Sequence, residues 1–258
     1  MSYKRLELTS RNAVVIGGTS GIGLTIAKGL AQAGANVIAT GRRVHLVEAA
    51  AEEIRKIGTQ SLAIPCDVGD AASLQGVLEG AVKAWGSVDI LVNSAGTTKR
   101  APTLDVSQSD WDSILDTNLN GTLRSCQVFG RHMIERRYGR IINIGSLGSL
   151  LALYEVTAYC ASKAAVAALT KSLAIEWAKH GVCVNAIVPG VFRTDLNAKL
   201  LEGTPRGAEF LMRTPMGRFG QLEELVGAAI FLASEAVSFV TGHLLAVDGG
   251  ILVSGANQ

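Results

Sequence analysis

The chain has 258 residues, of which 48% are hydrophobic and 18% charged, and its net charge is +2 at pH 7. This composition is typical of a globular protein with a large core and excludes a largely disordered chain. Because the sequence has no basic run, no acidic tail and no stretch of about 18 apolar residues, we expect neither a nucleic-acid partner nor a membrane span.

Short, continuous apolar runs alternate with longer amphipathic patterns along the chain. The runs lie at residues 13–16, 37–39, 62–64, 90–92, 141–144, 182–188 and 244–247. Continuous apolar strands indicate burial on both faces, as in a parallel sheet covered by helices. The pattern predicts one α/β domain over residues 1–258, with a doubly wound parallel sheet of about seven strands and helices on both faces.

A glycine-rich turn follows the first expected strand and precedes an expected helix. Its residues are Gly17, Gly18, Thr19, Ser20, Gly21, Ile22 and Gly23. Such a turn lets the backbone approach a pyrophosphate, and the helix N-terminus directs its amides and its dipole at the same group. A dinucleotide cofactor is therefore expected here, although glycines also mark ordinary turns.

The end of the second expected strand indicates which nicotinamide cofactor is used. A carboxylate at this place would bond the ribose hydroxyls and repel a 2′-phosphate. The sequence has instead Arg42 and Arg43 after Gly41. Two guanidinium groups that can bind a phosphate favour NADP(H), whereas the alternative is that they only solubilise the start of a helix.

A serine, a tyrosine and a lysine follow the fifth expected strand. Ser146 comes just after this strand, separated from it by Gly145, and Tyr159 and Lys163 are four residues apart, on one face of an expected helix. A neighbouring ammonium favours the phenolate, so we expect Lys163 to lower the pKa of Tyr159 toward the working range of a proton donor or acceptor. The Ser146 hydroxyl would hold the same substrate oxygen.

These motifs resemble the classical short-chain dehydrogenase/reductase family over essentially the whole length of the chain, and the resemblance implies a Rossmann-type sheet. Two positions depart from the family pattern, Ile16 before the first glycine and Ser94 after Asn93. The positions that match the family's motifs are Gly17, Gly21, Gly23, Asp67, Val68, Asn93, Ala95, Gly96, Asn118, Ser146, Tyr159, Lys163, Pro189, Gly190 and Thr194.

The resemblance also implies roles for these residues. Tyr159 would be the general acid for carbonyl reduction, and Lys163 would also bind the nicotinamide ribose. Asn118 would hold a water that links Lys163 to solvent, and Thr194 would hold the cofactor's carboxamide. Singly, Ser146 could equally be a cap and Asn118 an ordinary helix residue.

Further motifs look like the gluconate 5-dehydrogenase branch of the family, whose members interconvert a 5-keto sugar acid and its alcohol. On this basis Arg100 is expected to pair with a sugar carboxylate and Asn197 to bond a hydroxyl, with residues 191–215 forming a lid over the substrate. An ion pair at an interface is an equally weighted alternative for Arg100.

Three other functions remain open. A 3-oxoacyl-carrier-protein reductase would share every catalytic residue and would need a basic patch, for which Lys99, Arg100 and Arg131 are the candidates. A broad-specificity carbonyl reductase would share the same catalytic core. A non-enzymatic NADP(H)-binding sensor would have a broken catalytic set, whereas this one is intact.

The remaining expectations concern assembly, metal and compartment. Apolar helix faces between Trp111 and His132, and after Tyr159, favour helix packing between subunits and a homotetramer. The four cysteines and four histidines are scattered, so no metal site is expected. Free cysteines and the absence of a signal-like segment favour a cytoplasmic protein.

Overall fold

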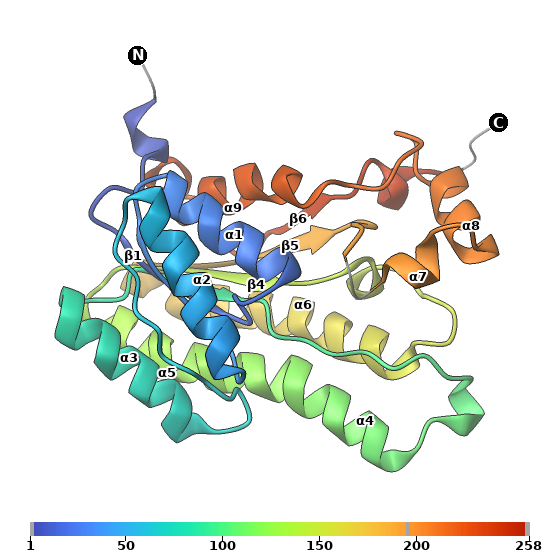
Figure 1. The fold of residues 1–258 in the computed structure, drawn as a ribbon, viewed down its shortest axis with the longest axis horizontal. Helices are drawn as coiled ribbons and strands as arrows, with labels where there is room; N and C mark the ends of the chain where they lie inside the picture. Colours follow the sequence, from blue (N-terminus) through green and yellow to red (C-terminus); the bar gives the residue numbers. More distant parts are fainter. Residues whose placement is uncertain (1–2, 195–196, 256–258) are drawn as a thin grey trace.

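The computed structural model describes residues 3–194 and 197–255. It is built around a parallel sheet with the strand order β2-β1-β3-β4-β5-β6 (Figure 1). The strands are β1 (Asn12–Ile16), β2 (Asn36–Thr40), β3 (Ile90–Asn93), β4 (Gly139–Ile144), β5 (Val182–Pro189) and β6 (Leu244–Val247). The expected doubly wound α/β sheet is therefore confirmed.

The strand count among the described residues is six, so the seventh strand expected at residues 62–64 is wrong. Backbone bonds join this segment to β2 and Gly41 at its two ends, from the Val37 amide to the Gln60 carbonyl and from the Cys66 amide to the Gly41 carbonyl, both at 3.0 Å, but residues 62–64 form no ladder. Side chains make the contacts between these ends. The Asn36 Oδ1 accepts from the Gln60 amide at 3.2 Å, and the Thr40 hydroxyl donates to the Ile64 carbonyl.

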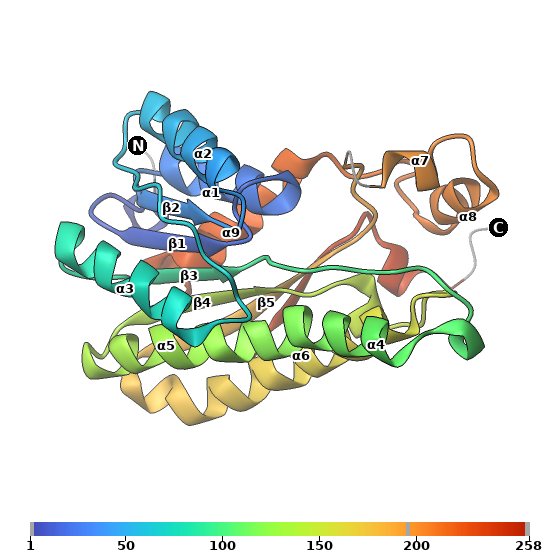
Figure 2. The same cartoon turned by 60° about the horizontal axis from the view of Figure 1, so that its bottom comes forward.

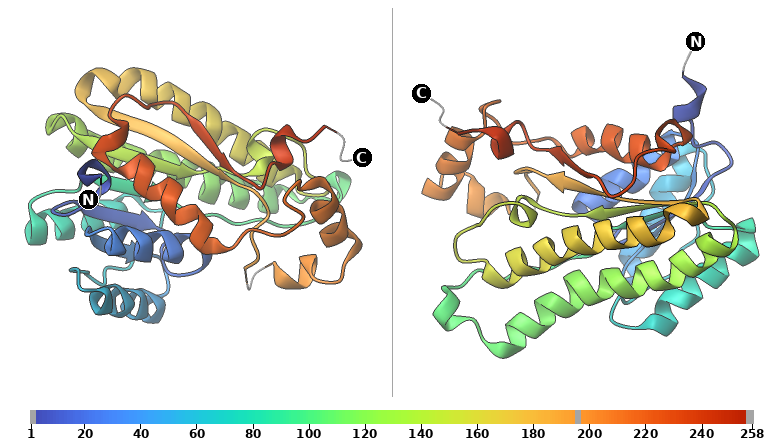
Figure 3. Two further views of the ribbon diagram at one scale, coloured as in Figure 1. Left: turned by 90° about the horizontal axis from the view of Figure 1, so that it is seen from above. Right: turned by 180° about the vertical axis from the view of Figure 1, so that it is seen from behind.

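Helices cover both faces of the sheet, as Figures 2 and 3 show. One face carries α1 (Gly21–Gln32), α2 (Val44–Ile57) and α9 (Val226–Ala233), and the other carries α3 (Ala71–Trp85), α5 (Gly121–Glu135) and α6 (Thr157–Trp177). Alternate residues of β1 enter the two cores: Ala13 and Val15 lie in one, Val14 and Ile16 in the other. Burial on both faces explains the continuous apolar runs of β1 to β5. The expectation that residues 244–247 form a buried strand is wrong in its burial, because β6 lies at the edge of the sheet and is only partly buried.

The remaining helices extend beyond the carboxyl ends of the strands. They are α4 (Gln108–Leu115), α7 (Ala198–Leu201) and α8 (Pro205–Arg213), and Figure 2 shows α7 and α8 as a separate pair after β5. Residues 195 and 196, inside the expected lid at 191–215, lie outside the described residues. No helix in the described part of the chain is long and apolar enough to cross a membrane.

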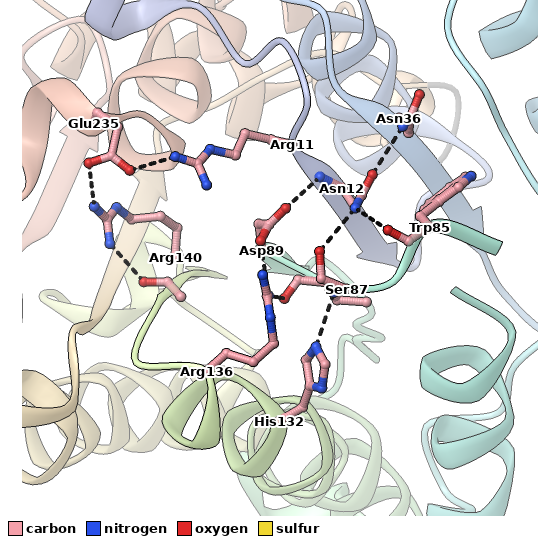
Figure 4. A network of polar contacts seen from close by, with 12 residues as sticks. Arg11, Asn12, Asn36, Trp85, Ser87, Asp89, His132, Arg136, Arg140 and Glu235 are labelled. Atoms are coloured by element: carbon pink, nitrogen blue, oxygen red, sulfur yellow. Dashed lines mark hydrogen bonds and ion pairs between the residues drawn. The ribbon is translucent and has the colours of Figure 1, made fainter. Parts of the chain in front are cut away.

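A polar network joins the amino ends of the strands (Figure 4). The carboxylate of Asp89, which is 2% exposed, accepts from the Asn12 amide at 3.0 Å and from Arg136 Nη1 at 3.0 Å. Glu235 forms ion pairs with Arg11, just before β1, and with Arg140 on β4. A buried carboxylate needs such partners, so this edge of the sheet is braced, while the opposite edge carries the glycine-rich turn and Ser146.

Candidate active site

Ser146 lies at the end of β4, where a short 3-10 turn (Leu147–Ser149) begins. Its Oγ accepts a hydrogen bond from the Gly148 amide at 3.1 Å, and its own amide donates to Ser149 Oγ at 3.2 Å. These two bonds form a capping box, which determines the course of the chain as it leaves the sheet. The Ser146 hydroxyl is thereby held at the carboxyl edge of the sheet.

Tyr159 and Lys163 lie one helical turn apart on α6, as their spacing predicts. The Lys163 Nζ donates to the carbonyl oxygen of Ile144, the last residue of β4, at 2.8 Å. The same Nζ lies 5.8 Å from the centroid of the Tyr159 ring. Because Tyr159 also hydrogen-bonds to Ser146, the structure brings all three predicted side chains together.

Ser149 connects the two elements that carry these side chains, and the sequence analysis missed it. Its Oγ donates to the carbonyl oxygen of Lys163 at 2.9 Å and accepts from the Ser146 amide at 3.2 Å. The signal in the sequence is the spacing of two serines three apart after a strand, which is that of a capping box. Ser149 ties the Ser146 turn to the middle of α6.

Burial dominates the electrostatics of the trio. It raises the pKa of Tyr159, while the hydrogen bond with Ser146 lowers it. Burial also lowers the pKa of Lys163 to about 8. The net direction for Tyr159 is opposite to the one expected from its lysine neighbour, because removal of the phenolate from water outweighs the favourable contacts.

Asn118 lies in a π-helical turn, Asp116–Asn120, between α4 and α5. The sequence suggested one helical pattern here, and a π turn inside such a pattern frequently marks a functional position. Asn118 is fully buried. Its Oδ1 accepts from the Thr97 amide at 2.7 Å, and its Nδ2 donates to the Thr97 carbonyl at 2.9 Å and to Ser162 Oγ at 3.0 Å.

The segment after β3 contacts this asparagine and the lysine. A Cβ on Gly96 would lie 3.4 Å from Asn118 Oδ1 and 3.7 Å from Lys163 Nζ, which are ordinary contact distances, so the backbone at residue 96 lies next to both side chains. Asn93 is buried and donates to Asn143 Oδ1 at 2.9 Å, which joins β3 to β4. It therefore braces the sheet beneath the site.

The glycine-rich turn is shaped as a cradle. A Cβ on Gly17, whose φ is +74°, would lie 2.5 Å from the Ala95 amide nitrogen, and one on Gly23 would lie 2.1 Å from the Gly17 carbonyl oxygen. Ser20 precedes α1 but makes no side-chain cap, so amides of the first turn remain available. Residues 17–23 thus fit the pyrophosphate of a dinucleotide.

Arg42 and Arg43 lie beyond the end of β2, next to this turn. A Cβ on Gly41 would lie 3.2 Å from Thr19 Oγ1, which places the two segments side by side. Both arginines are exposed, and within the described residues neither side chain has a hydrogen bond or an ion pair, whereas the backbone carbonyl of Arg43 accepts from the Leu46 and Val47 amides at the start of α2. Their charges fit the 2′-phosphate of NADP(H).

Two further cofactor positions follow the sheet. Asp67 and Val68 lie in the turn before α3, where Asp67 Oδ1 accepts from the Gly69 amide at 2.9 Å. Pro189 ends β5, and a Cβ on Gly190 would lie 2.5 Å from the Asp248 Cα. These contacts determine the backbone path on either side of the sheet's carboxyl edge.

Thr194 and Asn197 have different surroundings. The methyl of Thr194 lies 3.8 Å from the Cβ position of Gly21, so this threonine reaches the start of α1. The amide group of Asn197 is engaged by the backbone: its Oδ1 accepts from the Thr194 amide at 2.8 Å, and its Nδ2 donates to the Phe192 carbonyl at 2.8 Å. Asn197 therefore holds Thr194 in place. The bond to a substrate hydroxyl that the sequence predicts for Asn197 would have to compete with these two backbone bonds.

Arg100 is bonded within the chain. Its Nε donates to Glu155 Oε2 at 2.6 Å. The neighbouring Lys99 pairs with Asp110 at 2.7 Å. Arg131 lies on α5 and lines a cavity against α3 together with Glu79 and Glu135. The three basic residues that a carrier-protein site would need thus form no common patch.

Metal ligation finds no support among residues 3–194 and 197–255, where no three His, Cys, Asp or Glu side chains form a potential metal site. The four cysteines are free thiols in the structure.

Comparisons with known proteins identify relatives over nearly the whole chain. A family model described as enoyl-(acyl carrier protein) reductase matches residues 17–252. Gluconate 5-dehydrogenase of Gluconobacter oxydans is 42% identical over 98% of this chain and 100% of its own length, and D-threitol dehydrogenase of Mycolicibacterium smegmatis is 41% identical over 96% and 95%. A crystal structure of a gluconate 5-dehydrogenase from Burkholderia cenocepacia, in complex with NADP and tartrate, is 40% identical and covers 98% of this chain and 99% of that one, with a TM-score of 0.93.

Proposed function

Because this chain belongs to the short-chain dehydrogenase/reductase family, we propose that it is an NADP(H)-dependent oxidoreductase that interconverts the ketone and the secondary alcohol of a sugar acid, such as 5-ketogluconate and gluconate. The observation that carries this proposal is the convergence of Ser146, Tyr159 and Lys163 at the carboxyl edge of the sheet. This edge is where ligands bind in open α/β folds.

The proposed chemistry divides between these side chains. Tyr159 passes a proton to the carbonyl oxygen during reduction and removes it during oxidation. Ser146 holds that oxygen by a hydrogen bond, so the proton transfer occurs over a short and defined distance. Bound NADP(H) supplies or accepts the hydride. Lys163 binds the nicotinamide ribose and, as a buried cation, favours the phenolate form of Tyr159.

In the proposed proton path, Asn118 holds the neighbouring backbone with its side chain and leaves its backbone carbonyl oxygen for a water. Its side-chain Oδ1 and Nδ2 both bond the Thr97 backbone, and its backbone carbonyl oxygen accepts from Thr122 Oγ1 at 2.8 Å. A carbonyl oxygen has two lone pairs, so it retains capacity for a water that exchanges the Lys163 proton with solvent.

The proposed cofactor site extends from the glycine-rich turn to the nicotinamide end. Residues 17–23 bind the pyrophosphate, and Arg42 and Arg43 select NADP(H) by binding its 2′-phosphate. Asp67 and Val68 border the adenine. Asn93, Ala95, Gly96, Pro189 and Gly190 shape the central part, and Thr194 binds the carboxamide.

The sugar-acid assignment rests on the named relatives and on Arg100. The Burkholderia cenocepacia structure is a complex with NADP and with tartrate, a hydroxylated dicarboxylate. Arg100 uses only Nε in its bond to Glu155, so its two terminal nitrogens can form the fork that suits a carboxylate. We propose that residues 191–215, with α7 and α8, form the lid over this substrate.

A carrier-protein reductase receives less support. An acidic carrier would need a continuous basic surface, but Lys99 and Arg100 are each paired with a carboxylate and Arg131 lies against α3. The neutral polyol in the name of the Mycolicibacterium relative makes a polyol dehydrogenase the stronger second candidate.

A homotetramer in the cytoplasm is the proposed form of the enzyme. Exposed apolar side chains support assembly: Ile175 on α6 is 82% exposed, and Phe239 before β6 is fully exposed. Light scattering of the purified protein measures the number of subunits, and a monomer would contradict the proposal.

The deciding experiment follows NADPH oxidation with 5-ketogluconate, 2-ketogluconate, an acetoacetyl thioester and an aromatic ketone, and repeats each assay with NADH. We expect 5-ketogluconate with NADPH to have the highest kcat/KM. A higher value for the thioester or the aromatic ketone would overturn the sugar-acid assignment while leaving the catalytic residues in place.

A further inference from the structure

The ion pair between Arg100 and Glu155 joins two segments that both lead to the catalytic residues. Its donor and acceptor atoms are 2.6 Å apart, and the Glu155 side chain is 19% exposed while that of Arg100 is 44% exposed. The carboxylate of Glu155 is therefore partly shielded from water, so its charge is less screened than one on an open face, while the guanidinium of Arg100 is exposed and accessible to a ligand.

Hydrogen bonds place this pair beside the site. Thr97 is held by the buried side chain of Asn118, and four residues later the Ala101 amide donates to the Glu155 carbonyl at 2.9 Å. Glu155 itself precedes Tyr159 by four residues. The pair therefore lies at the start of α6, on the segment that delivers the proton donor.

The helix α8 also reaches this point. Arg206 Nη1 donates to the carbonyl oxygen of Tyr154, the residue before Glu155, at 3.2 Å. A substrate that lies between Tyr159 and the lid would thus be within the field of Arg100 and Glu155. Within the described residues, the terminal nitrogens of Arg100 have no recorded bond.

The backbone at Glu155 is unusual. Its φ is +62°, in the left-handed region where glycine and asparagine are at ease and a glutamate is uncommon. Such a conformation persists where the surrounding structure compensates for it. The carboxylate is therefore present at a position where the backbone alone would favour another residue, which points to a use for its charge.

We propose that the Arg100–Glu155 pair sets the preference of the enzyme between anionic sugar acids and neutral polyols. Arg100 attracts the substrate carboxylate, and Glu155 holds the guanidinium while its negative charge limits that attraction. This inference rests on the proposed function. Relatives named for the two substrate classes are about equally similar to this chain: the gluconate 5-dehydrogenase is 42% identical and the D-threitol dehydrogenase 41%.

The test compares gluconate with D-threitol as substrates for NADP⁺ reduction, because both are open-chain polyhydroxy compounds and only gluconate carries a charge; since they also differ in chain length, each variant is compared with the wild type on the same substrate. Arg100→Gln removes the cation, and Glu155→Gln removes the anion but keeps an oxygen that accepts from Arg100 Nε. We expect Arg100→Gln to lower kcat/KM for gluconate about tenfold or more, and Glu155→Gln to raise it about threefold, as expected when one charge near a bound anion is removed.

D-threitol should change by less than about twofold in either variant, because a neutral substrate does not feel the charge. The matched control is Glu52→Gln, which breaks an ion pair with Arg55 of similar length, 2.8 Å, on α2. It should leave both substrates unchanged. Raising the salt concentration should reduce the gluconate effects and spare those on D-threitol.

Equal changes for both substrates in each variant would overturn the proposal, since they would show a purely structural ion pair. So would a fall in gluconate activity in Glu155→Gln. The proposed function fails separately, if the wild type turns over D-threitol faster than gluconate. In that case inhibition by tartrate, an anion, still tests the pair: the inhibition constant should rise in Arg100→Gln and fall in Glu155→Gln.

Discussion

The ammonium of Lys163 donates to the carbonyl oxygen of Ile144 across 2.8 Å, in a place where the lysine is 5% exposed. This bond anchors α6 to the end of β4 and places the cation beneath the phenol of Tyr159. It also leaves the lysine with a charge that burial disfavours, because one carbonyl replaces the water around a free ammonium only in part.

The first prediction concerns the pH dependence of stability. Burial lowers the pKa of Lys163 from 10.5 to about 8, so between these values the unfolded chain binds more protons than the folded one. Stability from this group is therefore lowest below pH 8 and rises as the pH approaches 10.5, by up to about 3 kcal/mol.

Denaturant unfolding of the cofactor-free protein at pH 7 and pH 9.5 measures this effect, with Lys163→Met as the reference. The free energy of unfolding of the wild type should rise relative to the variant as the pH increases. A difference that stays constant, or that shrinks, would contradict the burial effect on Lys163.

The second prediction concerns the proton donor. Tyr159→Phe removes the hydroxyl and keeps the ring, so kcat should fall by about a factor of 10² to 10⁴. NADPH affinity, followed by fluorescence, should remain within about threefold, because the other cofactor contacts are unchanged. Tyr154→Phe is the matched control, since Tyr154 is 76% exposed, and it should keep full activity. Retained turnover in Tyr159→Phe would show that another group donates the proton.

The third prediction concerns cofactor choice. Arg42→Ala should raise the KM for NADPH about tenfold to a hundredfold, the range of a lost charge-assisted bond, and leave the KM for NADH nearly unchanged. Steady-state kinetics with both cofactors measure the ratio. Lys56→Ala, at the other end of α2, controls for a general loss of positive charge and should change neither value. Equal effects on NADPH and NADH would contradict a phosphate contact.

The fourth prediction concerns Ser149. Its hydroxyl holds the Ser146 amide and the Lys163 carbonyl, so Ser149→Ala should loosen the catalytic turn against α6. We expect kcat to fall about tenfold with the KM for NADPH unchanged, because misplacement affects the reacting atoms more than the cofactor.

A pH profile of kcat separates this positioning effect from a general loss of stability, since altered contact between Ser146 and Tyr159 should shift the pH at which activity rises. Ser109→Ala, at an exposed serine of α4, is the control and should have a normal profile. If Ser149→Ala keeps both kcat and the wild-type profile, Ser149 has no part in positioning the site.

Much of the fold could be predicted because the signals are local. Continuous apolar runs mark the strands, and β1 to β6 all coincide with such runs. Burial on both faces holds for β1 to β5, whereas β6 at the edge of the sheet is only partly buried. The run at residues 62–64 has the same composition but forms no ladder, and there the Asn36 and Thr40 side chains bond the Gln60 amide and the Ile64 carbonyl. These contacts join separate segments of the chain, so periodicity does not reveal them.

The sequence by itself determined which chemical groups are present at the site: the spacing of Tyr159 and Lys163, the serine after β4 and the glycine turn after β1 follow from the helix period and the strand ends. Only the tertiary structure decided what each group touches. In the folded chain Asn197 bonds the Thr194 amide, Arg100 pairs with Glu155, and Ser149 bonds the Lys163 carbonyl. Burial in the folded chain also raises the pKa of Tyr159. Hydrogen bonds and burial depend on distances between segments that the chain brings together only when it folds.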